Sequence, residues 1–166
     1  MSISILASTM SNSNGLQWAY LSNASGGTWS ASVTVDSSVE SNKAAGCKIA
    51  GGWGALFTRV ISGVSTVYWK TTPNPLSWAV AATSTGLTGN VWGLARNEAG
   101  VMCAVISTSV YISRNNGTTW VTGGTVSGLT EPSSITYLNG RFVIVMVNGD
   151  GTPRHWVSST GGASWS

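Results

Sequence analysis

The sequence predicts an all-β fold built from about four copies of one short unit. The first observation is a phrase of eight residues that begins with Ser or Thr, carries Ser or Thr before its last position and ends in tryptophan. Its tryptophans follow one another at intervals of 49, 42 and 45 residues: Trp29, Trp78, Trp120 and Trp165. A fixed period of this size indicates stacked copies of one supersecondary unit. The second observation is composition, because 21 glycines and no helical periodicity disfavour α-helices.

The last repeat shows the strands of the unit most clearly. Residues 134–138 predict a short strand, and Asn139-Gly140 is a signal for a type I′ hairpin turn. Residues 141–147 are almost continuously apolar, so we expect a second strand that is buried on both faces. Residues 153–158 predict a third strand, and a fourth begins at Trp165.

The other three repeats follow the same plan. In the third repeat we expect strands at 91–95, 101–106, 110–113 and from 120 onward. In the second repeat we expect them at 46–50, 55–60, 66–71 and 78–82. The first repeat begins late and lacks its innermost strand, which leaves strands at 2–8, 16–22 and 28–35.

Four antiparallel strands in a unit of about 45 residues are typical of one blade of a β-propeller. We therefore predict a single domain over residues 1–166, an all-β propeller of about four blades of which the first and the last are incomplete. The repeats are 1–35, 36–82, 83–123 and 124–166. Bare edges on such apolar strands invite pairing with another chain. The chain is then either a piece of a longer propeller or one of several copies that join edge to edge.

The repeated phrase resembles the Asp-box, or bacterial neuraminidase repeat, Ser/Thr-x-Asp-x-Gly-x-Thr-Trp, of sialidase-like propellers, and the four copies cover essentially the whole chain. No copy keeps the aspartate, whose position holds Ala24, Pro73, Asn115 and Thr160, and the second copy has Pro75 for the glycine. The resemblance implies that these turns are framework at the blade periphery. The framework residues are Ser22, Gly26, Trp29, Thr71, Trp78, Ser113, Gly117, Trp120, Ser158, Gly162 and Trp165.

An aromatic residue stands nine positions before each of these tryptophans, and we expect it to pack near the tryptophan of its own repeat. These four residues are Tyr20, Trp69, Tyr111 and Trp156.

Ligands are expected on the face of the propeller opposite to the turns that carry the repeated phrase. The sialidase-like propellers use that opposite face for their substrates. The loops that we assign to this face hold five candidate ligand-binding residues: Asp36, Glu40, Arg59, Glu131 and Asp150. Trp53, in the first turn of the second repeat, and Trp92, in an innermost strand, are candidate stacking surfaces for a sugar.

Catalysis is not expected. A sialidase needs three converging arginines, a tyrosine beside a glutamate and a catalytic aspartate, whereas this face offers Arg59 with Arg154 near its edge. Another glycosidase would need two facing carboxylates, for which Asp36 with Asp150, or Glu40 with Glu131, remain open. No Cys/His spacing indicates a metal site, and we predict no cofactor.

Charge and hydropathy narrow the partners further. The net charge is +3, but the eight basic residues do not cluster, so we do not expect nucleic-acid binding. No apolar run approaches the roughly 18 residues of a membrane span, and the start of the chain does not resemble a signal peptide. We expect Cys47 and Cys103 to be two free, buried thiols rather than a disulfide.

These observations predict a non-catalytic interaction module that binds other protein chains through its open blade edges, with glycans as a further class of partner. Its small, charge-poor, Ser/Thr/Gly-rich composition resembles that of structural or attachment components of phage particles, such as capsid decorations, tail fibres and adhesins, or of cell surfaces. The expected location is a virion or an extracellular surface. The alternatives are a glycan-binding lectin and a fragment of a sialidase-like glycoside hydrolase.

Overall fold

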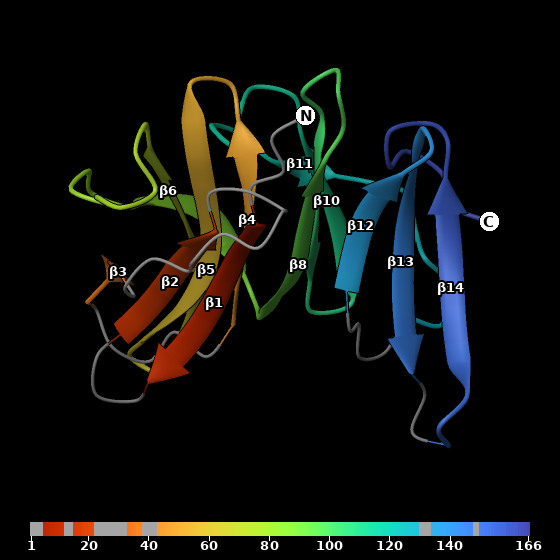
Figure 1. Cartoon of the computed structure of the whole chain (residues 1–166). Coiled ribbons are helices and arrows are strands. Elements are labelled where there is room, and N and C mark those ends of the chain that lie inside the picture. Colours follow the sequence, from red (N-terminus) through yellow and green to blue (C-terminus); the bar gives the residue numbers. More distant parts are fainter. Residues whose placement is uncertain (1–4, 12–14, 22–32, 38–42, 130–133, 148–149) are drawn as a thin grey trace.

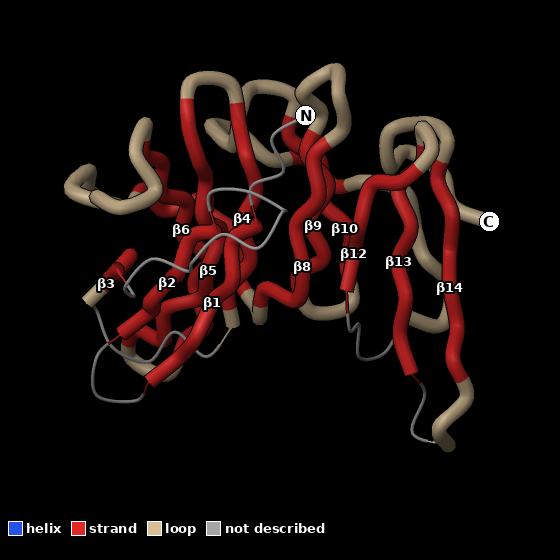
Figure 2. Tube along the Cα trace, in the orientation of Figure 1, coloured by secondary structure: helices blue, strands red, loops and turns tan. Residues whose placement is uncertain are grey.

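The computed structural model describes residues 5–11, 15–21, 33–37, 43–129, 134–147 and 150–166. Within these ranges the chain forms fourteen strands and no helix, and the strands make four antiparallel sheets. Figure 2 shows strands joined by loops throughout the described chain. The prediction of an all-β fold is confirmed.

Each sheet is a meander, in which strands that follow one another in sequence are also neighbours in space. The first sheet contains β1 (Ile5–Ser11), β2 (Gly15–Leu21) and β3 (Val33–Asp36). The second contains β4 (Ala44–Ile49), β5 (Gly52–Ile61), β6 (Val64–Thr72) and β7 (Thr83–Thr88). The third contains β8 (Val91–Arg96), β9 (Met102–Ile106), β10 (Ser109–Ser113) and β11 (Val121–Thr122). The fourth contains β12 (Ser134–Leu138), β13 (Arg141–Val147) and β14 (Pro153–Ser158).

The four sheets are successive blades of a β-propeller, and we call them the first to the fourth blade. Their innermost strands follow one another, since β4 contacts β8 and β8 contacts β12. In the first blade this place is taken by β1, which contacts β4. Figure 1 shows the blades in chain order, from the red first blade to the blue fourth blade.

The first and fourth blades are incomplete, as predicted. In the first repeat the described strands correspond to the three expected ones, so β1 is the innermost of them and lies beside β4. Within the described residues each has three strands, whereas the second and third have four. The fourth blade carries the beginning of a further strand, because Val157 and Ser166 exchange two backbone hydrogen bonds of 2.9 and 3.1 Å. The hairpin turn between β12 and β13 is also as predicted, with positive φ at both Asn139 (49°) and Gly140 (78°).

The outermost strand of the second blade lies later in the chain than predicted. Residues 78–82 form no strand, and β7 spans Thr83–Thr88 instead. Proline has no backbone N–H to donate to a strand ladder and restricts the residue before it, and Pro73 and Pro75 stand at the start of this connection. The chain therefore runs outside the sheet before it returns. In the first blade, β1 ends at Ser11 rather than at Ser8.

Three hydrophobic cores join the four blades. The core between the first and second blades contains Leu16, Val35, Trp53, Ala55, Phe57 and Trp78. The core between the second and third blades contains Leu56, Val67, Trp69, Met102 and Ile106, among others. The core between the third and fourth contains Cys103, Val105, Val110, Phe142, Ile144 and Met146, among others. Each blade is thus held chiefly by sheet-on-sheet burial of apolar side chains.

The central strands of the second and third blades contribute to the cores on both sides. In β9, Met102, Ala104 and Ile106 face the second blade, whereas Cys103 and Val105 face the fourth. The central strand of the fourth blade differs. In β13 buried residues alternate with more exposed ones, so the expectation that 141–147 is buried on both faces is wrong. Only the side chains that face the third blade are fully covered.

Candidate functional site

The third and fourth copies of the repeated phrase, which we call box turns, have the same hydrogen bonds. A buried serine hydroxyl accepts the backbone N–H of the glycine four residues later, from Gly117 to Ser113 Oγ and from Gly162 to Ser158 Oγ, both at 2.9 Å. The two glycines have φ of +83° and +89°, the left-handed conformation that favours glycine. These residues are therefore tied into the turn itself.

Other polar groups occupy the position of the missing aspartate. Asn115 Oδ1 accepts the backbone N–H of Thr119 at 2.9 Å, and Thr160 Oγ1 accepts that of Ser164 at 2.9 Å. Either oxygen satisfies a backbone donor of the turn. An uncharged acceptor is thus enough to close the turn.

The closing tryptophans of three box turns donate their indole N–H to a carbonyl three residues earlier. The pairs are Trp78 with Pro75, Trp120 with Gly117 and Trp165 with Gly162, at 3.0, 3.0 and 3.1 Å. Ser22, Gly26 and Trp29 of the first box turn lie outside the described residues.

The sequence pattern assigns Thr71 to the second box turn. In the structure the hydroxyl that organises this turn belongs to Thr72 instead. Thr72 is buried, and its hydroxyl accepts the N–H of Asn74 at 3.1 Å. Strand register supports the equivalence of Thr72 and Ser113. Thr72 pairs with Trp53 and Ser113 pairs with Met102, and both of these partners face the preceding blade. The second turn is one residue shorter, which accounts for the shift.

This shift turns the neighbouring side chains of the second blade to opposite faces, because side chains alternate along a strand. Lys70 takes the place of Tyr111 and faces the first blade, where its Nζ donates to the carbonyl of Val35 at 2.6 Å. Trp69 faces the third blade, with its ring centroid 6.2 Å from that of Trp120 at an interplanar angle of 75°. Trp69 and the tryptophan of its own repeat belong to different cores.

Two candidate ligand-binding residues form an ion pair with one another. Asp36, at the end of β3, accepts hydrogen bonds from Arg59 of β5: Nε donates to Oδ1 at 3.2 Å, and Nη2 donates to Oδ2. Asp36 is buried, and the Arg59 guanidinium lies 4.3 Å from the centre of the Tyr68 ring. Burial lowers the pKa of the nearby Lys70, and the negative charge of Asp36 raises it by a smaller amount. The ion pair joins the first and second blades.

The other candidate acids do not join this pair. Asp150 is exposed in the turn before β14 and accepts the backbone N–H of Thr152 at 2.9 Å, which lowers the pKa of its carboxyl. Glu40 and Glu131 lie outside the described residues. Among the described residues there is no group of three or more His, Cys, Asp or Glu side chains that could hold a metal ion.

The two candidate stacking tryptophans are largely covered. Trp53 is 7% exposed and belongs to the core between the first and second blades. Trp92, in β8, is half-buried against the core between the third and fourth blades, and Lys43 Nζ lies 4.5 Å above its ring. Their packing leaves little free ring surface for a sugar.

Both cysteines are free thiols. Burial raises the pKa of Cys47 and of Cys103 to about 12, so both carry their proton at neutral pH. In the part of the chain that the structure describes, no helix is long and apolar enough to cross a membrane.

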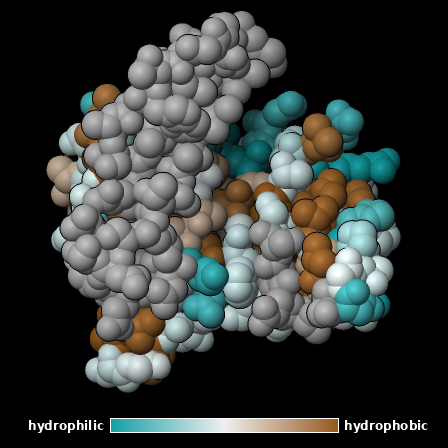
Figure 3. Space-filling model, turned by 60° about the horizontal axis from the view of Figure 1, so that its bottom comes forward, coloured by the Kyte–Doolittle hydropathy of each residue, from teal (hydrophilic) through white to brown (hydrophobic). Residues whose placement is uncertain are grey.

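The fourth blade presents an apolar surface that the sequence did not single out. Val143, Val145 and Val147 of β13 point away from the third blade, and across from them on β14 stand Val157, His155 and Pro153. We call these six residues the open face. Val145 is 44% exposed and Val147 58%, and much of the surface forms a shallow depression of ≈ 370 Å³. Figure 3 shows hydrophobic side chains gathered where β13 and β14 lie.

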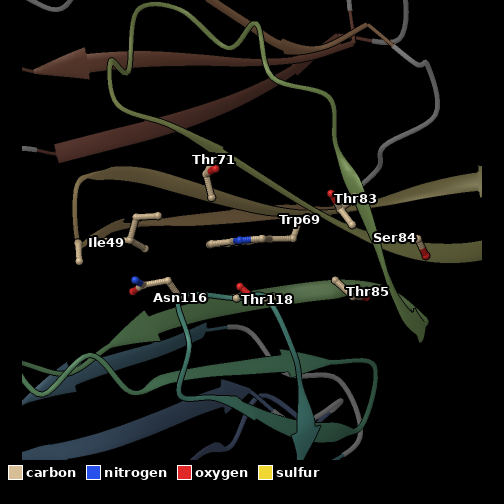
Figure 4. A pocket seen from close by; sticks show the side chains of 10 residues that line it. Ile49, Trp69, Thr71, Thr83, Ser84, Thr85, Asn116 and Thr118 are labelled. Carbon is tan, nitrogen blue, oxygen red and sulfur yellow. The ribbon is translucent and has the colours of Figure 1, made fainter.

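A second hollow, which we call the seam pocket, lies between the second and third blades. Its volume is ≈ 360 Å³, and it is formed by the end of β4, by β6 and β7, and by the third box turn. Figure 4 shows Trp69 crossing this pocket, with Thr71 and Thr83 on one side and Asn116 and Thr118 on the other.

The fold and these surfaces define a β-propeller segment whose fourth blade exposes apolar side chains of β13. No family model matches the chain. No curated protein matches it. Among solved structures, YCF48 bound to a D1 peptide is similar to this chain, with 13% identity and a TM-score of 0.47 over 91% of this chain and 46% of the other. The chain thus spans a little under half the length of that protein chain.

Proposed function

We propose that the protein is a non-catalytic interaction module that binds another protein chain through the open face of its fourth blade. The observation that carries this proposal is the uncovered apolar surface on β13. Exposed apolar patches bounded by polar residues are typical of protein-binding sites. Here Arg154 and His155 border the valines.

The partner that fits this surface best is a second copy of the chain. Three contacts within the chain already pack one blade on the next through alternate residues of the central strands. Val145 occupies the place that Val105 has in β9, and Val105 is completely buried by the fourth blade. A blade of a second copy on the open face would continue the same packing, and repeated contacts of this kind can close into a ring.

The placement of two candidate acids, Asp36 and Asp150, supports a role without catalysis. Asp36 is neutralised by Arg59 within the interface of two blades, and Asp150 is exposed and bound to its own turn. A glycosidase needs two carboxyl groups that face one substrate from set positions. Attachment to a phage particle or a cell surface, and contact with glycans, remain predictions from composition.

The test is the mass of the protein in solution, measured by analytical ultracentrifugation over a range of concentrations. We expect the wild type to self-associate and the Val145→Asp and Val147→Asp variants to be monomers, because a charge in a sheet-on-sheet contact would be buried without a partner. Val121→Asp is the matched control, since Val121 is 59% exposed on the third blade. A wild type that stays monomeric, or association that Val145→Asp leaves unchanged, would contradict the proposal.

A further inference from the structure

We propose that the seam pocket binds a neutral saccharide. This site is separate from the open face and does not depend on the role proposed for it. Its volume of ≈ 360 Å³ lies in the lower part of the range of about 300–1,000 Å³ that is typical of ligand sites. Its lining combines apolar groups, such as Ile49 and Trp69, with hydroxyl and amide side chains, and contains no charged residue.

Trp69 presents a hydrogen-bond donor to this pocket. The indole N–H groups of Trp78, Trp120 and Trp165 all donate to carbonyls of their own turns. The N–H of Trp69 has no acceptor in the described protein, and it is not among the fully buried atoms that lack one. Trp69 lines the seam pocket, so its indole N–H is a candidate donor to an acceptor oxygen of a ligand there.

Further polar groups are available around this donor. The side chains of Thr71, Thr83 and Asn116 all line the pocket, and none of them makes a hydrogen bond within the described protein. Together they offer two hydroxyls and one amide, each able to donate and accept. Such groups match the hydroxyls of a sugar, which also donate and accept. Ile49 lies beside them in the lining.

The corresponding seam between the third and fourth blades is closed. In the second blade Thr83 pairs with Trp69. At the equivalent place in the third blade the N–H of Gly123 donates to the carbonyl of Val110. There the next glycine, Gly124, donates its N–H to the carbonyl of Gly162 in the fourth box turn at 2.8 Å.

Side-chain size explains why only one of the two seams is open. A Cβ atom on Gly124 would lie 2.4 Å from the carbonyl oxygen of Ala163. The corresponding positions of the second blade carry side chains, those of Thr83 and Ser84, and both line the seam pocket. The seam pocket is thus a property of particular side chains and not of the repeat.

The experiment is a titration of isotopically labelled protein with neutral sugars, namely glucose, galactose, mannose and N-acetylglucosamine, followed by two-dimensional NMR. We expect at least one sugar to shift the Trp69 indole and Asn116 amide signals to saturation. The Thr83→Val and Asn116→Gly variants should bind that sugar at least about tenfold more weakly, as expected for a lost polar contact. Glycine at position 116 also keeps the positive φ of 54°.

Thr125→Ala is the control variant, because Thr125 is exposed beside the closed seam, and it should bind like the wild type. The dispersed spectrum of each variant reports that it is folded. Absence of any shift with all four sugars would overturn the proposal. Shifts that persist undiminished in both pocket variants would also overturn it.

Discussion

The central strands of the third and fourth blades, β9 and β13, have the same place in their sheets but different coverage. Val105 of β9 is fully buried between two blades, whereas Val145, at the equivalent position of β13, is 44% exposed. Both are valines in apolar strands with two hydrogen-bonded neighbours. The difference shows that coverage of a blade face depends on a neighbouring sheet, and it makes the second face of β13 available for binding.

The largest expected effect comes from placing the same charge at these two positions. Val105→Asp should destabilise the protein by more than about 4 kcal/mol or prevent folding, because it buries a carboxylate without a partner. Val145→Asp should change the unfolding free energy of the monomer by no more than about 1 kcal/mol. Chemical denaturation at low protein concentration measures both. Equal losses in the two variants would show that β13 is covered on both faces.

A moderate effect is expected on the covered side of the fourth blade. Gly124→Ala should cost about 1–3 kcal/mol, because the added Cβ would force apart the backbones of Gly124 and Ala163. Thr125→Ala, at the next and exposed residue, should change stability by less than about 0.5 kcal/mol. Thermal unfolding of both variants checks this. Similar melting temperatures for the two would mean that the third and fourth blades are not in close contact there.

The smallest effect on stability is expected for thiols on β9 and β13, but these thiols should differ clearly in their reactivity. Cys103 of β9 is fully buried and has a pKa of about 12, so it should not react with a disulfide reagent in the folded protein at about pH 8. A cysteine introduced by Val145→Cys should react readily. Mass spectrometry of the labelled peptides separates the two sites, and rapid labelling of Cys103 under native conditions would contradict its burial.

The same thiol predicts the direction of a pH dependence. The pKa of Cys103 is higher in the folded chain than its ordinary value of 9.0. Its contribution to stability is therefore complete below about pH 9 and is lost as the pH rises toward 12. Denaturation curves measured across this window should show decreasing stability, and the decrease should be smaller in a Cys103→Ala variant.

Much of the fold could be predicted because its signals are local. The tryptophan period indicated the number of units, alternating and apolar runs indicated most strands, and Asn139-Gly140 indicated a hairpin through its need for positive φ. The glycine and serine of the third and fourth box turns also act within a few residues of one another. These features depend on backbone conformation and short-range hydrogen bonds, which the amino-acid types largely dictate.

Contacts between blades were beyond the reach of such patterns. A turn shorter by one residue made Thr72 the organising hydroxyl and turned Trp69 toward the third blade, although counting back from Trp78 pointed to Thr71. Asp36 and Arg59, both expected on a ligand face, neutralise one another across two blades. The seam pocket and the open face likewise depend on which side chains meet between sheets. Residues far apart in the chain set those distances, so the linear order of amino acids gave no sign of them.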